Sequence, residues 1–221
     1  MRIKKEALKI PMLIVIVILL ILIIFLIRTS VPGKGTETTK QETVSEPEEY
    51  KLYGETITKA EVDEQYNALP AEVQNNITKQ EVADAIATQR LLLKEAEKLN
   101  IEVSDEEVEA FIQQNLALAS ITQEEYQAKL AESGVTEEEY QEQLKQQMLI
   151  LKLINQSISP DDYKVSDEEV DAFMEENKDT YEAMFEQAPE LEEVMREQIR
   201  TSLMQQKQQE LIKEFIDSLK Q

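Results

Sequence analysis

The side chains that most often carry out covalent chemistry are missing from this sequence. It contains no His and no Cys, which excludes Ser-His and Cys-His nucleophile pairs and zinc sites built from His or Cys. It has no glycine-rich phosphate-binding loop, and its acidic run from Asp161 to Asp171 lacks the central Gly of a calcium-binding loop. Carboxylates are so frequent that paired Asp or Glu residues do not indicate acid–base catalysis. The sequence therefore predicts a protein that is not an enzyme and has no cofactor or metal.

Methionine and its apolar neighbours indicate binding instead. Five of the seven Met residues lie in the second half of the polar region, at positions 148, 174, 184, 195 and 204. Flexible thioethers adapt to apolar partners of varied shape, but Met also fills gaps in helical cores, an interpretation that we prefer for Met148 and Met195. Met184 and Phe185 lie near a helix break at Pro189, so we expect this pair to be exposed. The binding surface that we expect consists of Met174, Met184, Phe185, Leu191 and Met195.

Residues 10–27 form an uninterrupted apolar stretch of eighteen residues without a charge. A helix of this length spans about 27 Å, close to the hydrocarbon thickness of a bilayer. A buried soluble helix would keep a polar face. A cleaved signal peptide would have a shorter apolar region and a small-residue cleavage site, whereas Arg28 follows directly here. The stretch predicts an uncleaved, single-pass transmembrane anchor in the lipid bilayer.

The charges that flank this stretch predict its orientation. Residues 1–9 carry four basic side chains and one acidic side chain, which favours a cytoplasmic tail. The rest of the chain is then extracytoplasmic, tethered to the cell membrane. Residues 28–49 are rich in Pro, Gly, Ser, Thr and Glu, a composition that predicts a flexible linker. Residues 50–221 are expected to form one helical domain.

The part of the chain beyond the anchor is strongly acidic. Residues 29–221 carry 18 Lys and Arg against 44 Asp and Glu. Such a surface repels nucleic acid, so we expect no nucleic-acid partner. It attracts basic or unfolded segments weakly and in a salt-dependent way.

Capping boxes, in which Ser or Thr is followed three residues later by Glu, mark the starts of amphipathic helices. They occur at Thr58/Glu61, Thr78/Glu81, Ser104/Glu107, Thr122/Glu125, Thr136/Glu139 and Ser166/Glu169. Only 50–57 has strand character. The helices that we expect cover 59–68, 71–76, 79–99, 105–118, 123–132, 137–157, 167–185 and 190–220.

Two of these helices, 79–99 and 137–157, have broad apolar faces and should form the core. The last helix instead has two apolar stripes, separated by the polar segment 205–210. It either bridges two packing sites or is a single helix with a solvated central turn. The second stripe, which we expect to pack against the N-terminal helices, comprises Leu211, Ile212, Phe215, Ile216 and Leu219.

Three segments of the sequence resemble the SurA/PrsA-type chaperones. Residues 54–61, GETITKAE, are similar to the opening of the SurA N-terminal domain, with Tyr53 where Asn is usual. Residues 91–108, LLLKEAEKLNIEVSDEEV, are similar to the family's next signature. Residues 165–178, VSDEEVDAFMEENK, resemble the helix that leads into a parvulin prolyl-isomerase domain in those proteins.

A parvulin module is about a hundred residues long, but only eight residues separate Tyr181 from the terminal helix pattern. The resemblance therefore implies the chaperone lobe alone, all-α, closed by the long C-terminal helix and preceded by one transmembrane helix. Such a lobe would bind unfolded or nascent polypeptides without ATP, as a holdase. Two alternatives remain: a non-catalytic structural or adaptor module of an envelope complex, and a peptidyl-prolyl isomerase by family name only.

Overall fold

A computed structural model of the chain describes residues 47–188 and 191–221. The expected tail, the anchor at 10–27 and nearly all of the linker lie outside these residues. Within the two described ranges, no helix combines the length and the apolar character needed to cross a membrane.

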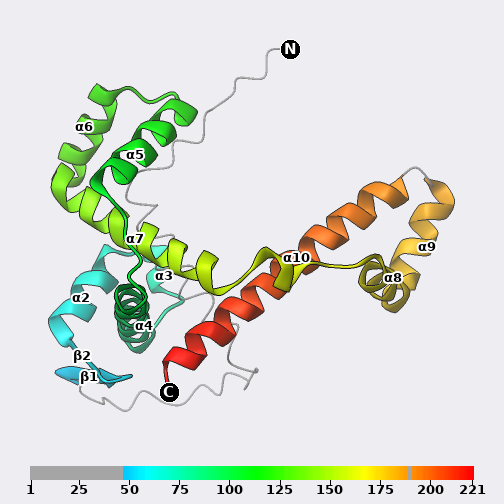
Figure 1. The fold of residues 1–221 in the computed structure, drawn as a ribbon, viewed down its shortest axis with the longest axis horizontal. Helices are drawn as coiled ribbons and strands as arrows, with labels where there is room; N and C mark the ends of the chain where they lie inside the picture. The colour runs from blue at the N-terminus through cyan, green and yellow to red at the C-terminus, as the bar shows by residue number, and fades with distance from the viewer. Residues whose placement is uncertain (1–46, 189–190) are drawn as a thin grey trace. The chain divides into compact units, whose positions relative to one another are not determined.

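The described chain is mostly helical, which confirms the expected class in its coarse form (Figure 1). A short hairpin precedes the helices. The elements are β1 (Glu49–Leu52), β2 (Glu55–Thr58), α2 (Lys59–Ala68), α3 (Ala71–Gln74), α4 (Lys79–Lys98), α5 (Asp105–Ala119), α6 (Gln123–Ser133), α7 (Glu137–Ser157), a 3₁₀ turn (Pro160–Tyr163), α8 (Asp167–Glu176), α9 (Lys178–Gln187) and α10 (Glu192–Leu219).

The hairpin occupies the segment in which the sequence showed strand character. β1 and β2 are antiparallel, and Tyr50 pairs with Ile57 on the buried face. The two residues of the turn, Tyr53 and Gly54, both have positive φ angles, 54° and 78°. This geometry matches the right-handed twist of a hairpin, but it is unfavourable for a bulky residue such as Tyr.

All six expected capping boxes are present. In each, the Ser or Thr oxygen accepts a hydrogen bond from the amide of the Glu, and that Glu accepts one from the cap amide. These bonds satisfy amide donors that a helix start leaves unpaired. Gly134 ends α6 in the left-handed conformation, with φ at 69°, as glycine at a helix end commonly does.

The prediction of a single helix over 167–185 is wrong, because α8 ends at Glu176 and α9 begins at Lys178. Asn177 lies between them with φ −110° and ψ 24°. Its side-chain amide donates to the Phe173 carbonyl at 2.7 Å, and its own carbonyl accepts from the Thr180 amide at 3.0 Å. Asn competes in this way with the regular helical ladder.

The chain divides into two compact units. Unit 1 runs through Leu153 and also includes Leu219–Gln221, and unit 2 comprises Ile154–Ser218. The domain boundaries expected from the sequence stay a prediction.

Unit 1 contains two hydrophobic clusters. One joins the hairpin to α2, α3 and α4, and the other joins α5, α6 and α7. Figure 1 shows the hairpin beside α2 and α4. The buried face of α4 is built largely of small residues. Leu99, which the sequence placed at the end of the core-forming helix 79–99, lies beyond the end of α4 and is 42% exposed. The buried positions of α4 are Val82, Ala83, Ala85, Ala87, Thr88, Leu92 and Ala96.

Unit 2 has few buried apolar side chains, namely Ile158, Val170, Ile199 and Ile216. Ile199 and Ile216 are separated by about 25 Å along α10, so these side chains do not form one compact cluster. α10 is continuous through its polar segment, where Lys207 donates to the Lys164 carbonyl at 3.0 Å and pairs with Glu169 at 2.5 Å. This segment is therefore bonded within unit 2 rather than wholly solvated.

Candidate functional site

A pocket of about 300 Å³ lies in unit 2, where α8, α9 and α10 meet. It is the best candidate for a functional site because it combines apolar side chains with a paired charge network. Its lining residues are Asp171, Met174, Glu175, Lys178, Tyr181, Phe185 and Arg196.

Two aromatic rings and a thioether form the apolar part of the pocket. Tyr181 and Phe185 are four residues apart on α9, so they share one face of the helix. Their rings stack with centroids 5.9 Å apart and an interplanar angle of 11°. Met174, on α8, is half-buried like the two rings. The arrangement offers polarisable apolar surface that is still accessible to a ligand.

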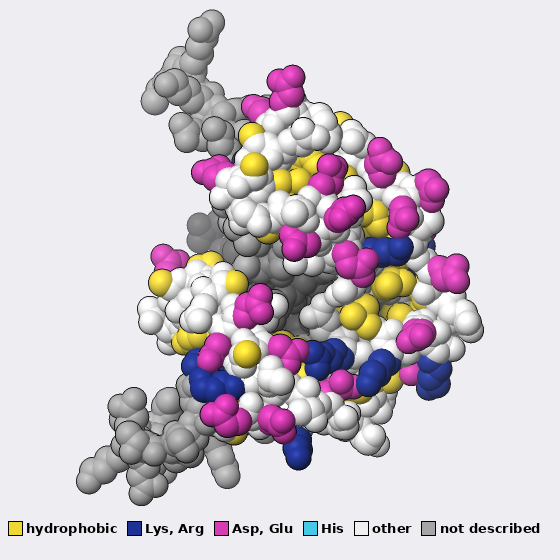
Figure 2. All heavy atoms as spheres, turned by 90° about the vertical axis from the view of Figure 1, so that its left-hand side faces the viewer, with side chains coloured by type: hydrophobic (Ala, Val, Ile, Leu, Met, Phe, Trp, Pro, Cys, Tyr) yellow, Lys and Arg dark blue, Asp and Glu magenta, His cyan; other side chains and the backbone are white. Residues whose placement is uncertain are grey.

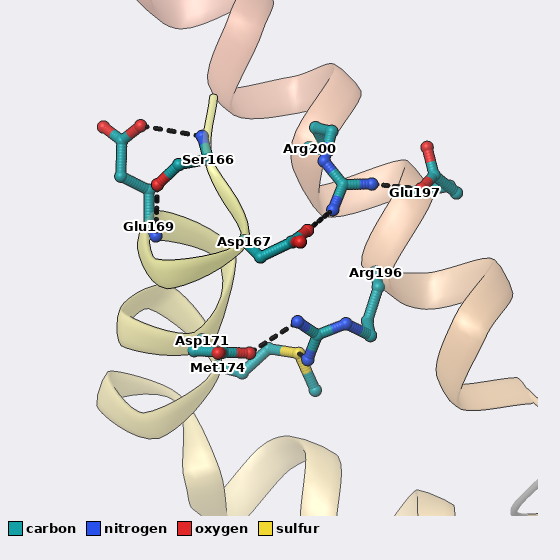
Figure 3. Close-up of polar contacts among 8 residues, drawn as sticks. All are labelled: Ser166, Asp167, Glu169, Asp171, Met174, Arg196, Glu197 and Arg200. Atoms are coloured by element: carbon teal, nitrogen blue, oxygen red, sulfur yellow. Dashed lines mark hydrogen bonds and ion pairs between the residues drawn. The ribbon is translucent and has the colours of Figure 1, made fainter. Parts of the chain in front are cut away.

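Arg196, on α10, lines the pocket and points toward Asp171 and Met174 of α8 (Figure 3). Its guanidinium pairs with Asp171 at 2.5 Å, and its other terminal nitrogen lies 3.6 Å from the Met174 sulfur. The hydrogen bond with Asp171, followed by the fields of Asp171, Asp167 and Glu192, raises the pKa of Arg196 above its usual value. Arg196 is therefore held in place by Asp171, which neutralises its charge, and it stays protonated and does not act in proton transfer.

Further ion pairs connect α8 to α10 beside the pocket. Arg200 bonds both Asp167 and Glu197, as Figure 3 shows. Glu169 lies in the first turn of α8. Its pKa is lowered mainly by the hydrogen bond from Lys207 and then by the one from the Ser166 amide. These exposed pairs contribute little stability individually, but they fix the register of the two helices that hold Met174 and Arg196.

The residues expected to bind clients are distributed unevenly around this pocket. Met174 and Phe185 line it together. Met195 is half-buried on α10, and Leu191 is 41% exposed just before that helix, but neither contributes to the lining. The Met184 side chain lies outside the described part of the structure. Binding by these residues stays a prediction.

Sequence reasoning did not single out Tyr181 or Arg196 for the site. The spacing of Tyr181 and Phe185 was a usable signal, since residues four apart on a helix meet on one face. Arg196 gave no such signal, because its pairing with Asp171 depends on how α8 and α10 pack. Across the described residues, no group of three or more carboxylates is arranged to hold a metal ion.

Comparison with known proteins decides the family. A family model described as "SurA-like N-terminal domain" matches residues 1–154. The chain belongs to this family. The match ends one residue beyond Leu153, where the long segment of unit 1 ends. Unit 2, which holds the pocket, therefore lies outside the matched residues apart from Ile154.

One relative extends the comparison. The chain is 32% identical over 167 residues to "Foldase protein PrsA" of Caldanaerobacter subterraneus subsp. tengcongensis. The alignment covers 66% of this chain and 48% of the relative, so the chain spans about half the length of the curated relative it matches. No solved structure matches.

Proposed function

We propose that this SurA-like chain is an ATP-independent holdase that binds unfolded or nascent polypeptides outside the cytoplasmic membrane. Membership of the SurA-like N-terminal domain family and similarity to a protein named as a foldase support a role in protein folding. In this proposal the apolar residues 10–27 anchor the chain in the cell membrane, with a cytoplasmic N-terminus, and the C-terminal helix closes the chaperone lobe.

The pocket in unit 2 carries the proposal. Its volume of about 300 Å³ suits one large apolar side chain and not a folded partner's surface. Met174 supplies an adaptable contact, and the stacked rings of Tyr181 and Phe185 supply a rigid one. A site of this kind accepts apolar side chains of different shapes, as a chaperone for varied clients requires.

The chemistry of the lining argues for binding rather than catalysis. Asp171 and Arg196 neutralise each other, and neither His nor Cys occurs in the sequence. A general base needs a pKa near the working pH and access to a reacting atom, whereas the pKa of Arg196 is raised further above its usual value by its bond with Asp171. We therefore assign the site no catalytic step.

An aggregation assay tests the proposal with a matched pair of variants. The purified full chain is added to an unrelated protein that aggregates on heating, and light scattering is recorded. Phe185→Ser should remove most of the suppression because it takes away half of the stacked pair. Phe111→Ser is the control, since Phe111 is 38% exposed on α5 of unit 1 and does not line the pocket.

Each outcome of the assay has a clear reading. Suppression by the wild type and by Phe111→Ser, with loss in Phe185→Ser, supports the proposal, provided that the variants have similar far-UV circular dichroism. No suppression by the wild type overturns the holdase function. If both variants suppress aggregation equally, the holdase function does not depend on this pocket.

A further inference from the structure

The cations around the pocket are already neutralised by the protein's own carboxylates. Arg196 pairs with Asp171 at 2.5 Å, and Lys178 lies 3.7 Å from Glu175. Each of these pairs joins one lining cation to one lining carboxylate, so the charged residues of the lining sum to zero. The preference for one sign of ligand charge must therefore come from the carboxylates of unit 2 around the pocket.

The same excess of negative charge extends over the whole of unit 2. Residues 154–218 carry eighteen Asp and Glu against six Lys and Arg. Among the described residues of the unit, ion pairs join Lys164 to Asp161, Lys178 to Glu175, Arg196 to Asp171, Arg200 to Asp167 and Lys207 to Glu169. After this pairing the unit keeps an excess of twelve negative charges, which sets the sign of the field at the pocket.

Asp and Glu side chains are also widespread elsewhere on the molecule. On the face shown in Figure 2, they surround hydrophobic side chains that reach the surface. The unit 2 pocket differs from a bare acidic surface because Met174, Tyr181 and Phe185 line it together beside these charges.

Resting on the proposed function, we infer that unit 2 selects polypeptide segments in which a large apolar side chain lies next to Lys or Arg. The apolar side chain would occupy the space beside Met174, Tyr181 and Phe185. The neighbouring cation would lie near the exposed carboxylates at the end of α8, Glu175 and Glu176, and stay partly hydrated. Acidic segments of the same hydrophobicity are repelled before they reach the pocket.

Three peptides with the same apolar centre test this selection. They carry a central Phe flanked by two Lys, two Gln or two Glu, and each has a fluorescent label. Their dissociation constants for the full chain are measured by anisotropy. At about 50 mM salt the Lys-flanked peptide should bind at least about tenfold more tightly than the Glu-flanked one, and at about 500 mM the ratio should fall severalfold, because salt screens exposed charges.

Variants place the effect on unit 2. Glu175→Gln together with Glu176→Gln should lower the Lys-to-Glu ratio at low salt, because both carboxylates belong to the end of α8 beside the pocket. Glu109→Gln with Glu138→Gln removes the same charge from unit 1 and should leave the ratio nearly unchanged. All four are exposed, so folding should be preserved.

The outcomes separate this inference from the proposed function. If the three peptides bind equally and Phe185→Ser weakens all of them, the pocket binds clients but the charge selection is wrong. If none binds, the proposed function fails as well. If the unit 1 pair lowers the ratio as much as the unit 2 pair does, selection belongs to the whole acidic surface and the inference is overturned.

Discussion

Lys220 and Asp84 form an ion pair across 136 positions of sequence, with Nζ 3.3 Å from Oδ2. The two side chains are only 14% and 15% exposed. The Tyr53 hydroxyl donates to the other carboxylate oxygen of Asp84, and the Lys220 ammonium lies 4.8 Å from the centroid of the Tyr53 ring. Tyr53 thus contacts both Asp84 and Lys220. These contacts help to hold Tyr53 in the unfavourable positive-φ conformation that it adopts in the hairpin turn. Within unit 1, this cluster joins the end of the chain to the hairpin and to α4.

Replacing Lys220 should destabilise unit 1 appreciably. Lys220→Met leaves the Asp84 carboxylate mostly buried with one partner fewer, which costs about 1–3 kcal/mol. Lys98→Met is the control, because its partner Glu95 lies on the same helix and Lys98 is 73% exposed, so the change should be under about 1 kcal/mol. Urea unfolding measures both. Equal midpoints for the two variants would show that the Lys220 pair is no stronger than a surface pair.

Truncation after Gln209 tests the role of the second apolar stripe of α10. Ile216 is buried and the other four apolar side chains are half-buried. Full burial contributes about 1.5–3 kcal/mol per side chain in gross transfer terms before the entropy of ordering is subtracted, and half-burial contributes correspondingly less. The shortened chain should lose several kcal/mol in urea unfolding and aggregate more readily. If its midpoint hardly moves while client binding disappears, the stripe is a docking site and does not close the fold.

Tyr126→Phe should stabilise the protein. The Tyr126 hydroxyl is buried and has no hydrogen-bond partner among the residues that the structure describes. Burial, with smaller effects of Glu137 and Tyr140, raises the pKa of Tyr126 to about 12. Removing an unpaired buried polar group gains about 1 kcal/mol. Tyr66→Phe should have the opposite sign, because the Tyr66 hydroxyl donates to the Gln74 carbonyl at 3.0 Å. Thermal unfolding of both variants checks the contrast, and a loss of stability in Tyr126→Phe would refute the assignment.

Glu107→Gln should destabilise the protein at neutral pH but not in acid. The hydrogen bond from Lys152, followed by that from the Ser104 amide, lowers the pKa of Glu107. A depressed carboxyl pKa contributes stability above the ordinary value of about 4.5, and this is lost as the pH falls through the folded-state value. The urea midpoints of wild type and variant should therefore converge below about pH 4.5. A gap that stays constant down to pH 3 would contradict this linkage.

Capping boxes predicted the starts of the helices well, because the hydrogen bonds of a capping box form between residues three apart in the sequence. Thr58 and Glu61 satisfy each other's helix start whatever packs around them, and the helix over 59–68 has the expected bounds. Burial was predicted less well. The face of α4 depends on Ala83, Ala87 and Thr88, whose small size allows close packing but gives no hydrophobic signal.

Features that depend on long-range packing could not be predicted from sequence. The break at Asn177 was also missed, because mid-helix Asn is only mildly unfavourable on propensity alone, and Asn115 makes the same kind of bond, to Phe111, without ending α5. The pairing of Arg196 with Asp171 and of Lys220 with Asp84 requires the packed helices. Of the pocket, the sequence indicated Met174 and Phe185 but not the wall that encloses them.

Site-specific photo-crosslinking tests the central claim, that unit 2 holds unfolded polypeptide in its pocket, most directly. A photoreactive phenylalanine analogue replaces Phe185 in one full-length chain and Phe111 in another. Each is illuminated with an unfolding protein and with the same protein in its folded state. We predict strong crosslinks from position 185 to the unfolded form, few to the folded form, and few from position 111 to either. Equal crosslinking from both positions, or none from position 185, would contradict the account.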